Sequence, residues 1–193
     1  MAIPLPDQIQ TLRLVLRAPR ETDAAAIFNA YTQDADVARY MVWRPHKIVA
    51  ETEGFIASCM QGWASGTARP YVLALHANED MPIGMLDARI LQHTVDLGYV
   101  LGRQHWGSGL MCEAVSALTE ATLSLPDYFR VQATCDVENR ASARTLENAG
   151  FKREGIIERH LILPNISADP RASLMYARCK PTTLQTSSMV GGI

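Results

Sequence analysis

Residues 97–109 read LGYVLGRQHWGSG, and this stretch decides how the rest of the chain is interpreted. An apolar, strand-like run ends at Gly102, and Gly107-Ser108-Gly109 stands directly before a helix predicted from Leu110 onward. Glycine reaches backbone angles that are closed to other residues and lets a ligand approach the main chain. The start of a helix adds unpaired amide donors and the positive end of the helix dipole. The stretch therefore predicts a strand, a tight loop and a helix that together bind a phosphate group.

Two other phosphate-binding loops do not fit this spacing. A P-loop needs Lys-Ser or Lys-Thr directly after the glycines, where this chain has Leu110 and Met111. A dinucleotide-binding loop needs Gly-x-Gly-x-x-Gly inside a parallel βαβ unit, but Gly107-x-Gly109 has no third glycine and follows strands predicted to be antiparallel. The remaining pattern, Gln-x-x-Gly-x-Gly from Gln104, is typical of the pyrophosphate loop of acyl-coenzyme A transferases. A glycine turn that only lets helix and strand pack is the structural alternative.

The rest of the chain predicts an α/β protein with a mixed sheet covered by helices. Apolar runs bounded by polar breaks predict strands, and apolar positions at helical spacing predict helices. The predicted strands are 11–18, 71–75, 83–90, 94–101, 131–135, 151–163 and 174–179. The predicted helices are 22–31, 49–66, 110–123 and 140–149. The three strands between 71 and 101 are expected to form an antiparallel meander.

Length and composition limit the class of protein. A chain of 193 residues, 48% hydrophobic and 20% charged, fits one globular domain, placed at 1–180, followed by a flexible Ser/Thr/Gly-rich tail at 181–193. A net charge of -2 supplies no field for nucleic acid or anionic membrane. No secretory signal is recognised, and no segment approaches the roughly 20 apolar residues of a transmembrane helix. We therefore expect a cytoplasmic protein without nucleic-acid or membrane partners.

The cysteines predict neither a metal site nor a disulfide. Cys59, Cys112, Cys135 and Cys179 lie far apart, without the close pairs of zinc or redox sites. A free cysteine is usually a small core residue. A thiol nucleophile at Cys112 or Cys135 is the functional alternative.

Five motifs in chain order resemble the GNAT acetyltransferase superfamily, and most of all its RimJ/RimL branch. They are Leu97-Gly98-Tyr99-Val100-Leu101, Trp106-Gly107-Ser108-Gly109-Leu110-Met111, Glu113-Ala114, Asn139-x-x-Ser142 and Gly150-Phe151-Lys152-Arg153-Glu154-Gly155. The resemblance covers Leu12 to about Cys179 and implies the GNAT acyl-CoA N-acyltransferase fold, a bent central sheet of about seven strands flanked by four helices. It also implies that the fourth and fifth strands splay apart and leave a cleft for coenzyme A.

The resemblance further implies which residues hold acetyl-CoA. Backbone amides near Val100 and Leu101 would pair with the pantetheine arm as a neighbouring strand would. Asn139 would bond the arm from the opposite wall, or it only caps the next helix. Arg144 is a candidate for the 3′-phosphate. The residues implied for the pyrophosphate loop are Gln104, Trp106, Gly107, Ser108, Gly109 and Leu110.

In the family, the acceptor amine attacks the thioester directly, without a covalent enzyme intermediate. Ser142 is the residue expected to donate a hydrogen bond to the leaving thiolate. An ammonium cannot attack, so a base must remove its proton directly or through water. The predicted bases are Asp96, which shares a strand face with Gly98 and Val100, and Glu158.

Other bases stay open. Asp87 on the preceding strand, His93 and His160 are further candidates, since an imidazole titrates near neutral pH. RimL-type enzymes are similar in having a glutamate base on the strand after the Gly-Phe motif, but Arg159-His160-Leu161 stands there in this chain. The base and a ribosomal-protein acceptor are therefore both left open.

The predicted function is transfer of an acetyl group from acetyl-CoA to a primary amine, on a small molecule or a protein N-terminus. One alternative is another donor such as succinyl-CoA, for which Arg89 or Arg159 would supply the cation. The other is an acyl-CoA-binding protein that lacks a base. A homodimer is expected from the resemblance. The long connection 159–171 is expected either to reach over the acceptor site or to make a dimer contact.

Overall fold

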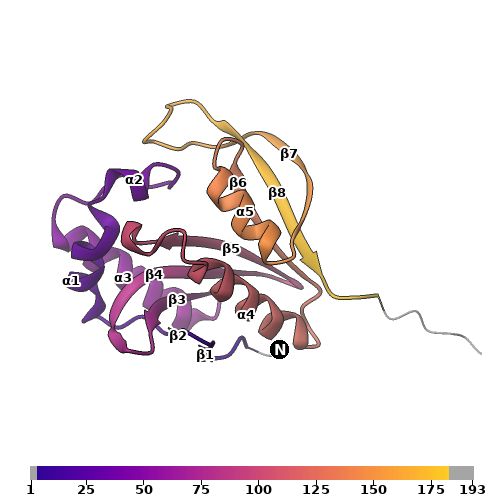
Figure 1. Ribbon diagram of the computed structural model, residues 1–193, viewed down its shortest axis with the longest axis horizontal. Coiled ribbons are helices and arrows are strands. Elements are labelled where there is room, and N and C mark those ends of the chain that lie inside the picture. Colours follow the sequence, from indigo (N-terminus) through magenta and orange to yellow (C-terminus); the bar gives the residue numbers. More distant parts are fainter. Residues whose placement is uncertain (1–3, 183–193) are drawn as a thin grey trace, which may run out of the picture.

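One mixed sheet of eight strands forms the centre of the computed structural model, which describes residues 4–182 (Figure 1). Its strand order is β1-β2-β3-β4-β5-β6-β8-β7. The strands are β1 (Gln8–Gln10), β2 (Leu14–Arg17), β3 (Ala68–Leu75), β4 (Asn78–Leu91), β5 (Thr94–Leu101), β6 (Arg130–Asp136), β7 (Lys152–Leu161) and β8 (Arg171–Cys179). The helices are α1 (Asp23–Ile27), the π-helical η1 (Phe28–Thr32), α2 (Ala35–Ala38), α3 (Val49–Ser65), the 3₁₀-helical η2 (Arg103–His105), α4 (Leu110–Ser124) and α5 (Arg140–Asn148).

The predicted mixed α/β architecture is confirmed, and β3, β4 and β5 form the predicted antiparallel meander. The prediction of about seven strands and four helices omitted three short elements, β1, α2 and η2, of three, four and three residues. Such short segments show no periodicity, and they form because neighbours supply partners. β1 pairs along β2, and the Asp34 side chain caps α2 by accepting a hydrogen bond from the Asp36 amide. Most of the predicted tail, 181–193, lies outside the described residues.

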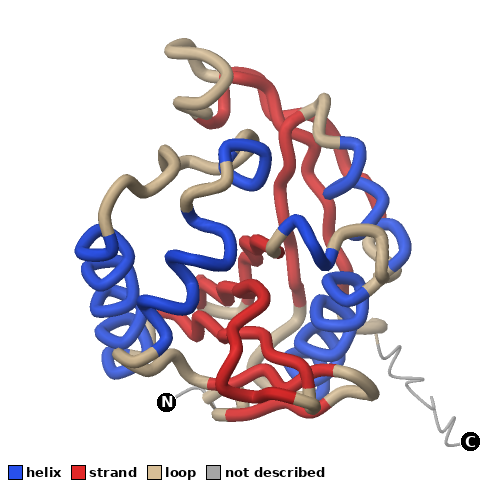
Figure 2. Tube along the Cα trace, turned by 60° about the vertical axis from the view of Figure 1, so that its left-hand side comes forward, coloured by secondary structure: helices blue, strands red, loops and turns tan. Residues whose placement is uncertain are grey.

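Helices cover both faces of the sheet, as the blue segments on either side of the strands in Figure 2 show. On the face of α1 and α3, Ile56 and Met85 are buried together, with Val100 of β5 packed against them. On the opposite face, Val115 of α4 is buried in one cluster with Leu97 of β5. Burial of an aliphatic side chain of this size contributes about 1.5–3 kcal/mol. The two clusters therefore hold β5 from both sides.

Among residues 4–182, no helix is long and apolar enough to cross a bilayer.

β5 and β6 separate along their length. They pair in parallel over four positions, from Thr94↔Arg130 to Leu97↔Ala133. β5 continues to Leu101, paired with β4 only, and β6 continues to Asp136, paired with β8 only. In Figure 1 the strands β6, β7 and β8 accordingly turn away from β3, β4 and β5. The predicted splay of the fourth and fifth strands of the expected sheet is thus confirmed, and residues 98–101 present an unpaired backbone edge.

Candidate active site

The loop between β5 and α4 has the backbone conformation that glycine alone adopts readily. Gly107 and Gly109 have φ angles of +71° and +77°. A Cβ at Gly107 would meet no atom within 4 Å, so the space above this residue is open. Gly109 is the N-cap of α4 and has no side chain that could accept hydrogen bonds from the first amides of the helix. Those amides therefore stay available to an anion, as the sequence predicts.

Three side chains, from Trp106 of the loop, Arg13 just before β2 and Glu113 of α4, hold this loop in place. The Trp106 indole N–H donates to the Leu101 carbonyl at 2.7 Å, which ties the loop to the end of β5. Arg13 donates to the Ser108 carbonyl at 2.8 Å and forms an ion pair with Glu113 of α4 at 2.6 Å. Burial raises the pKa of Glu113, but hydrogen bonds from Thr11 and Arg13 outweigh it and lower that pKa overall. The motif residue Glu113 thus anchors the loop, with a partner that sequence analysis missed because Arg13 lies about 100 residues away.

Ser142 in the first turn of α5 contacts the side chain of Tyr99 of β5 across the splay. The hydroxyl oxygens of Tyr99 and Ser142 lie 2.7 Å apart, and the Tyr99 hydroxyl also donates to the Ser142 carbonyl at 3.3 Å. Burial raises the pKa of Tyr99, so its hydroxyl stays protonated at neutral pH. Asn139 caps α5 by accepting a hydrogen bond from the Ser142 amide at 3.1 Å, the structural role anticipated for it. Tyr99 and Asn139 therefore position Ser142 on the wall that faces the free edge of β5.

Cys135, at the end of β6, lies beside the same serine. Burial raises the pKa of its thiol to about 11, and a hydrogen bond with Ser142 acts in the opposite direction. A thiol with that pKa is almost entirely protonated at neutral pH, and the thiolate is the reactive form. This environment favours the structural interpretation of Cys135 over the nucleophilic one.

Two carboxylates and one arginine lie on the face of β4 and β5 that is covered by α1 and α3. Asp87 is paired with Gly98 across the strands, and Arg89 with Asp96. Arg89 donates to Asp96 at 2.6 Å and 3.0 Å and to Asp87 at 3.3 Å. Gln132 of β6 adds a weak hydrogen bond to Asp96 at 3.3 Å. Asp96 is therefore held by two neighbours, directly where the splay begins.

Asp87 has a different environment from Asp96. Its Oδ1 is buried and accepts no hydrogen bond within the described part of the chain. Burial raises the pKa of Asp87, and the attraction to Arg89 opposes this increase only in part. Gly98 has no side chain, and the Arg89 guanidinium occupies the space over it, so Arg89 reaches one oxygen of the neighbouring Asp87 and leaves Oδ1 without a hydrogen bond. A partly buried carboxylate with a raised pKa and a free oxygen is suited to accept a proton.

The other predicted site residues lie on the surface. Glu158 and His160 are exposed on β7, within a bulge where Arg159 has a φ of +48°. His93 is exposed and packs against the ring of Phe129. Arg144 is exposed on α5. The roles proposed for them stay predictions.

Two connections far apart in the sequence meet above the open end of the splay, and we call them together the acceptor roof: residues 34–45 and 162–170. The Asn165 side chain donates to the carbonyls of Ala38 and Trp43 at 2.6 Å and 2.7 Å, which joins the two segments. Figure 1 shows α2 and the loop before β8 at the same end of the molecule. The long connection before β8 therefore packs on the segment that follows α2.

Both sides of the splay support the acceptor roof. Arg103, which follows β5, forms ion pairs with Asp34 and Asp36 at 2.9 Å and 3.0 Å. On the other side, the Tyr40 hydroxyl donates to the carbonyl of Glu138, which follows β6, at 3.5 Å. The acceptor roof thus bridges the ends of the two strands between which the cleft opens.

A strand edge without a neighbour beside a glycine loop at a helix start is the arrangement that the resemblance to acyl-coenzyme A transferases implies. Comparison with known families agrees with this class. The sequence model described as "Acetyltransferase (GNAT) domain" matches residues 13–152. The chain therefore belongs to the GNAT acetyltransferase family and is an acyl-CoA-dependent N-acetyltransferase.

Individual relatives are distant but cover most of the chain. The N-acetyltransferase p20 of Bacillus licheniformis is 27% identical over 154 residues, which make up 78% of this chain and 85% of that protein. A GNAT-family acetyltransferase from Bacillus anthracis superposes with a TM-score of 0.77 at 24% identity, covering 90% of this chain and 98% of that one. RimL, a ribosomal L7/L12 alpha-N-protein acetyltransferase solved with coenzyme A, superposes with a TM-score of 0.78 at 22% identity, covering 89% and 97%. These structures confirm the predicted GNAT fold.

Proposed function

We propose that this protein transfers the acetyl group of acetyl-CoA to a primary amine by direct attack. The observation that carries the proposal is the unpaired edge of β5 over residues 98–101, next to the open loop at Gly107. Amides of the pantetheine arm pair with the backbone of Val100 and Leu101 as an added strand would. The amides between Gln104 and Leu110 bind the pyrophosphate.

The remaining contacts to the cofactor come from α5. Arg144 is exposed on this helix, and we assign it to the 3′-phosphate, which a guanidinium binds well. Asn139 fixes the first turn of the helix. Its carboxamide N–H₂ group is left to bond the pantetheine arm, because the hydrogen bond to the Ser142 amide uses only its Oδ1 atom.

The reaction follows from the groups around the splay. The amine nitrogen attacks the thioester carbonyl carbon, and a backbone amide of β5 stabilises the oxyanion. The C–S bond then breaks, and the thiolate accepts a hydrogen bond from the Ser142 hydroxyl. Tyr99, 2.7 Å behind that hydroxyl, orients it.

We assign the general base to Asp87 in preference to the other predicted carboxylates. Asp87 has a free buried oxygen and a raised pKa. Asp96 is held by Arg89 and Gln132, so we give it the role of positioning Arg89. Glu158 is exposed on the edge strand β7.

A protein N-terminus is one candidate acceptor, because RimL, which this chain resembles in fold, acts on a ribosomal protein. A small amine is the other. We also infer one catalytic domain over 1–180, a homodimer and a cytoplasmic location from the family resemblance. A donor such as succinyl-CoA is less well supported, since the guanidinium of Arg89 already binds Asp87 and Asp96.

The first test is the thermal unfolding midpoint of the protein with acetyl-CoA, succinyl-CoA and NAD. A ligand that binds only the folded state raises the midpoint. We expect a rise with acetyl-CoA and none with NAD, followed by release of free thiol when amines are added. A larger rise of the midpoint with succinyl-CoA than with acetyl-CoA would instead assign succinyl-CoA as the acyl donor. Binding without thiol release across a broad panel of amines would favour the non-catalytic alternative, and no rise with either thioester would contradict the proposal.

A further inference from the structure

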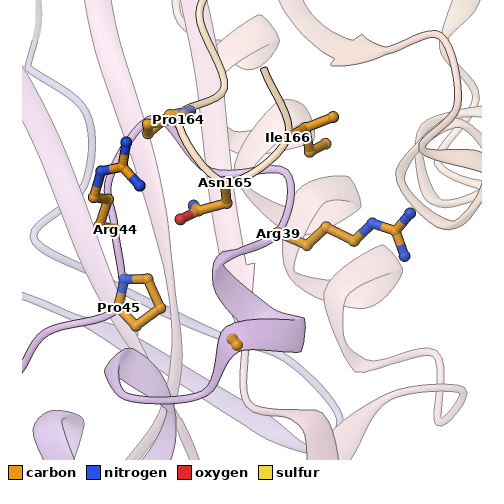
Figure 3. A pocket seen from close by; sticks show the side chains of 7 residues that line it. Arg39, Arg44, Pro45, Pro164, Asn165 and Ile166 are labelled. Carbon is orange, nitrogen blue, oxygen red and sulfur yellow. The ribbon is translucent and has the colours of Figure 1, made fainter. Parts of the chain in front are cut away.

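The acceptor roof contains an open pocket of about 610 Å³. Its lining includes Arg39, Arg44, Pro45, Asn165 and Ile166, so both segments of the roof contribute (Figure 3). This volume lies in the range of pockets that hold small ligands, about 300–1,000 Å³. The pocket is thus large enough for the part of an acceptor that lies beyond its reacting amino group.

The pocket carries unbalanced positive charge. Arg39 and Arg44 are exposed, and neither forms an ion pair with any residue in 4–182. Three acids of the same region bind other arginines: Asp34 and Asp36 bind Arg103, and Glu138 binds Arg171. Asp169 also belongs to the acceptor roof, but it does not line the pocket. Since the whole chain has a net charge of -2, this charge is a local feature and does not reflect a basic protein.

One of the two arginines contacts a residue that reaches the segment before α5. The guanidinium of Arg39 lies over the ring of Tyr40, 5.4 Å from its centroid. The Tyr40 hydroxyl bonds the carbonyl of Glu138, which directly precedes Asn139, the cap of the helix that carries Ser142. Tyr40 therefore connects the pocket residue Arg39 to the segment that precedes the helix of Ser142.

The two guanidinium groups flank the pocket without converging on one point. Figure 3 shows Arg44 beside Pro164 on one side of Asn165 and Arg39 extending on the other side. Asn165 itself is engaged with the main chain of the roof. This arrangement leaves each guanidinium to bind an anionic group separately.

From this geometry we propose that the acceptor amine carries carboxylate or phosphate groups, which Arg39 and Arg44 bind. Planar guanidinium groups recognise both kinds of anion. The inference rests on the proposed acetyl transfer and adds the chemical class of the acceptor. Acidic side chains that follow a peptide amino terminus and a small phosphorylated amine are two sources of this chemistry, which the test separates.

The test compares kcat/KM for matched amines at saturating acetyl-CoA. The peptide pair has serine at its free amino terminus, followed by two aspartates or by two asparagines. The small-molecule pair is phosphoethanolamine and ethanolamine. We expect the acidic member of at least one pair to be preferred about tenfold, through a lower KM, and the preference to decrease with added salt. The pair that shows the preference identifies the source.

The variants Arg39→Gln and Arg44→Gln should lose this preference while kcat and the KM for acetyl-CoA stay unchanged. Arg20→Gln is the matched control, because Arg20 is exposed and pairs only with the exposed Asp80 at the surface. Turnover without an acidic preference, or a preference that survives in both variants, overturns the inference. So does a variant that weakens acetyl-CoA binding instead, since the arginines would then serve the cofactor.

A binding measurement decides the question if no amine in the panel is acetylated. The unfolding midpoint is measured with inorganic phosphate in the presence of saturating coenzyme A, against chloride at equal ionic strength. Phosphate should protect the wild type and not the Arg39→Gln/Arg44→Gln double variant, and equal protection overturns the inference. Failure of the proposed function is distinguished by a different result, the absence of any effect of acetyl-CoA itself.

Discussion

The two sides of the cleft, to which we assign the cofactor and the acceptor, are built in different ways. The cofactor side consists of main chain from one continuous stretch, residues 97–110, with two glycines at positive φ and the start of α4. The acceptor side consists of side chains from the acceptor roof and β4, held together by hydrogen bonds such as those of Asn165 over more than 120 residues of sequence. Main-chain recognition suits a constant ligand, whereas side chains can vary with the acceptor.

The largest expected effect concerns the main-chain site. Gly107→Val should weaken acetyl-CoA binding about 1,000-fold or more, because it removes the positive φ that aims the amides and fills the space above them. Losing two charge-assisted hydrogen bonds at about 2 kcal/mol each has this magnitude. Isothermal titration calorimetry measures the dissociation constant.

Gly66→Val is the matched control for this change. Gly66 ends α3 with a φ of +72° and also has open space around it, so the backbone strain is similar. Both variants should lose stability, and only Gly107→Val should lose the cofactor. Equal affinity in the two variants would remove the glycine loop from the binding site.

The next effect concerns the base. Asp87→Asn should lower kcat about 100-fold and leave acetyl-CoA binding unchanged, a loss within the usual range for a general base. Asp96→Asn should lower kcat much less than Asp87→Asn does, since Asp96 acts through Arg89. Steady-state kinetics at saturating acetyl-CoA separates the two, and a larger loss at Asp96 would reverse the assignment.

The pH dependence tests the same residue independently. A base works in its deprotonated form, and burial raises the pKa of Asp87. The acid limb of kcat/KM should therefore fall off at a higher pH than an ordinary aspartate would give, with full activity above it. In Asp87→Asn this limb should disappear, and a limb that persists unchanged belongs to another group.

A smaller effect is expected at Ser142, which we assign to donate a hydrogen bond to the leaving thiolate. Ser142→Ala should lower kcat about tenfold, the value of one hydrogen bond to a developing charge. Tyr99→Phe should lower it about threefold, because Tyr99 only orients the serine hydroxyl. If Tyr99→Phe lowers kcat as much as Ser142→Ala does, or more, the tyrosine itself donates the hydrogen bond to the thiolate.

The smallest effect should come from the acceptor roof. Asn165→Ala removes the two hydrogen bonds that join its segments, and we expect the KM for the amine to rise about threefold as the roof loosens. The KM for acetyl-CoA should not change. A change in the cofactor's KM instead would show that the two sides of the cleft are not separate.

Sequence analysis predicted the local geometry wherever the decisive contacts are short-range. The glycine loop, the start of α4 and the cap of α5 by Asn139 depend on residues a few positions apart, and each has the predicted geometry. It missed β1 and α2, which depend on partners rather than on their own periodicity. It also missed Arg13 as the partner of the motif residue Glu113.

The sequence by itself determined the α/β class, the order of the long elements and the glycine loop before α4, because hydrophobic period and glycine spacing act over a few residues. Only the tertiary structure decided which carboxylate is free. Asp87 and Asp96 look alike in the sequence, but cross-strand register brings Arg89 and Gln132 to Asp96 and leaves Oδ1 of Asp87 buried without a hydrogen bond. Likewise, Arg39, Arg44 and Asn165 line one pocket only because two connections distant in the sequence pack together. Burial and pairing of charge depend on contacts across the fold, which local patterns do not contain.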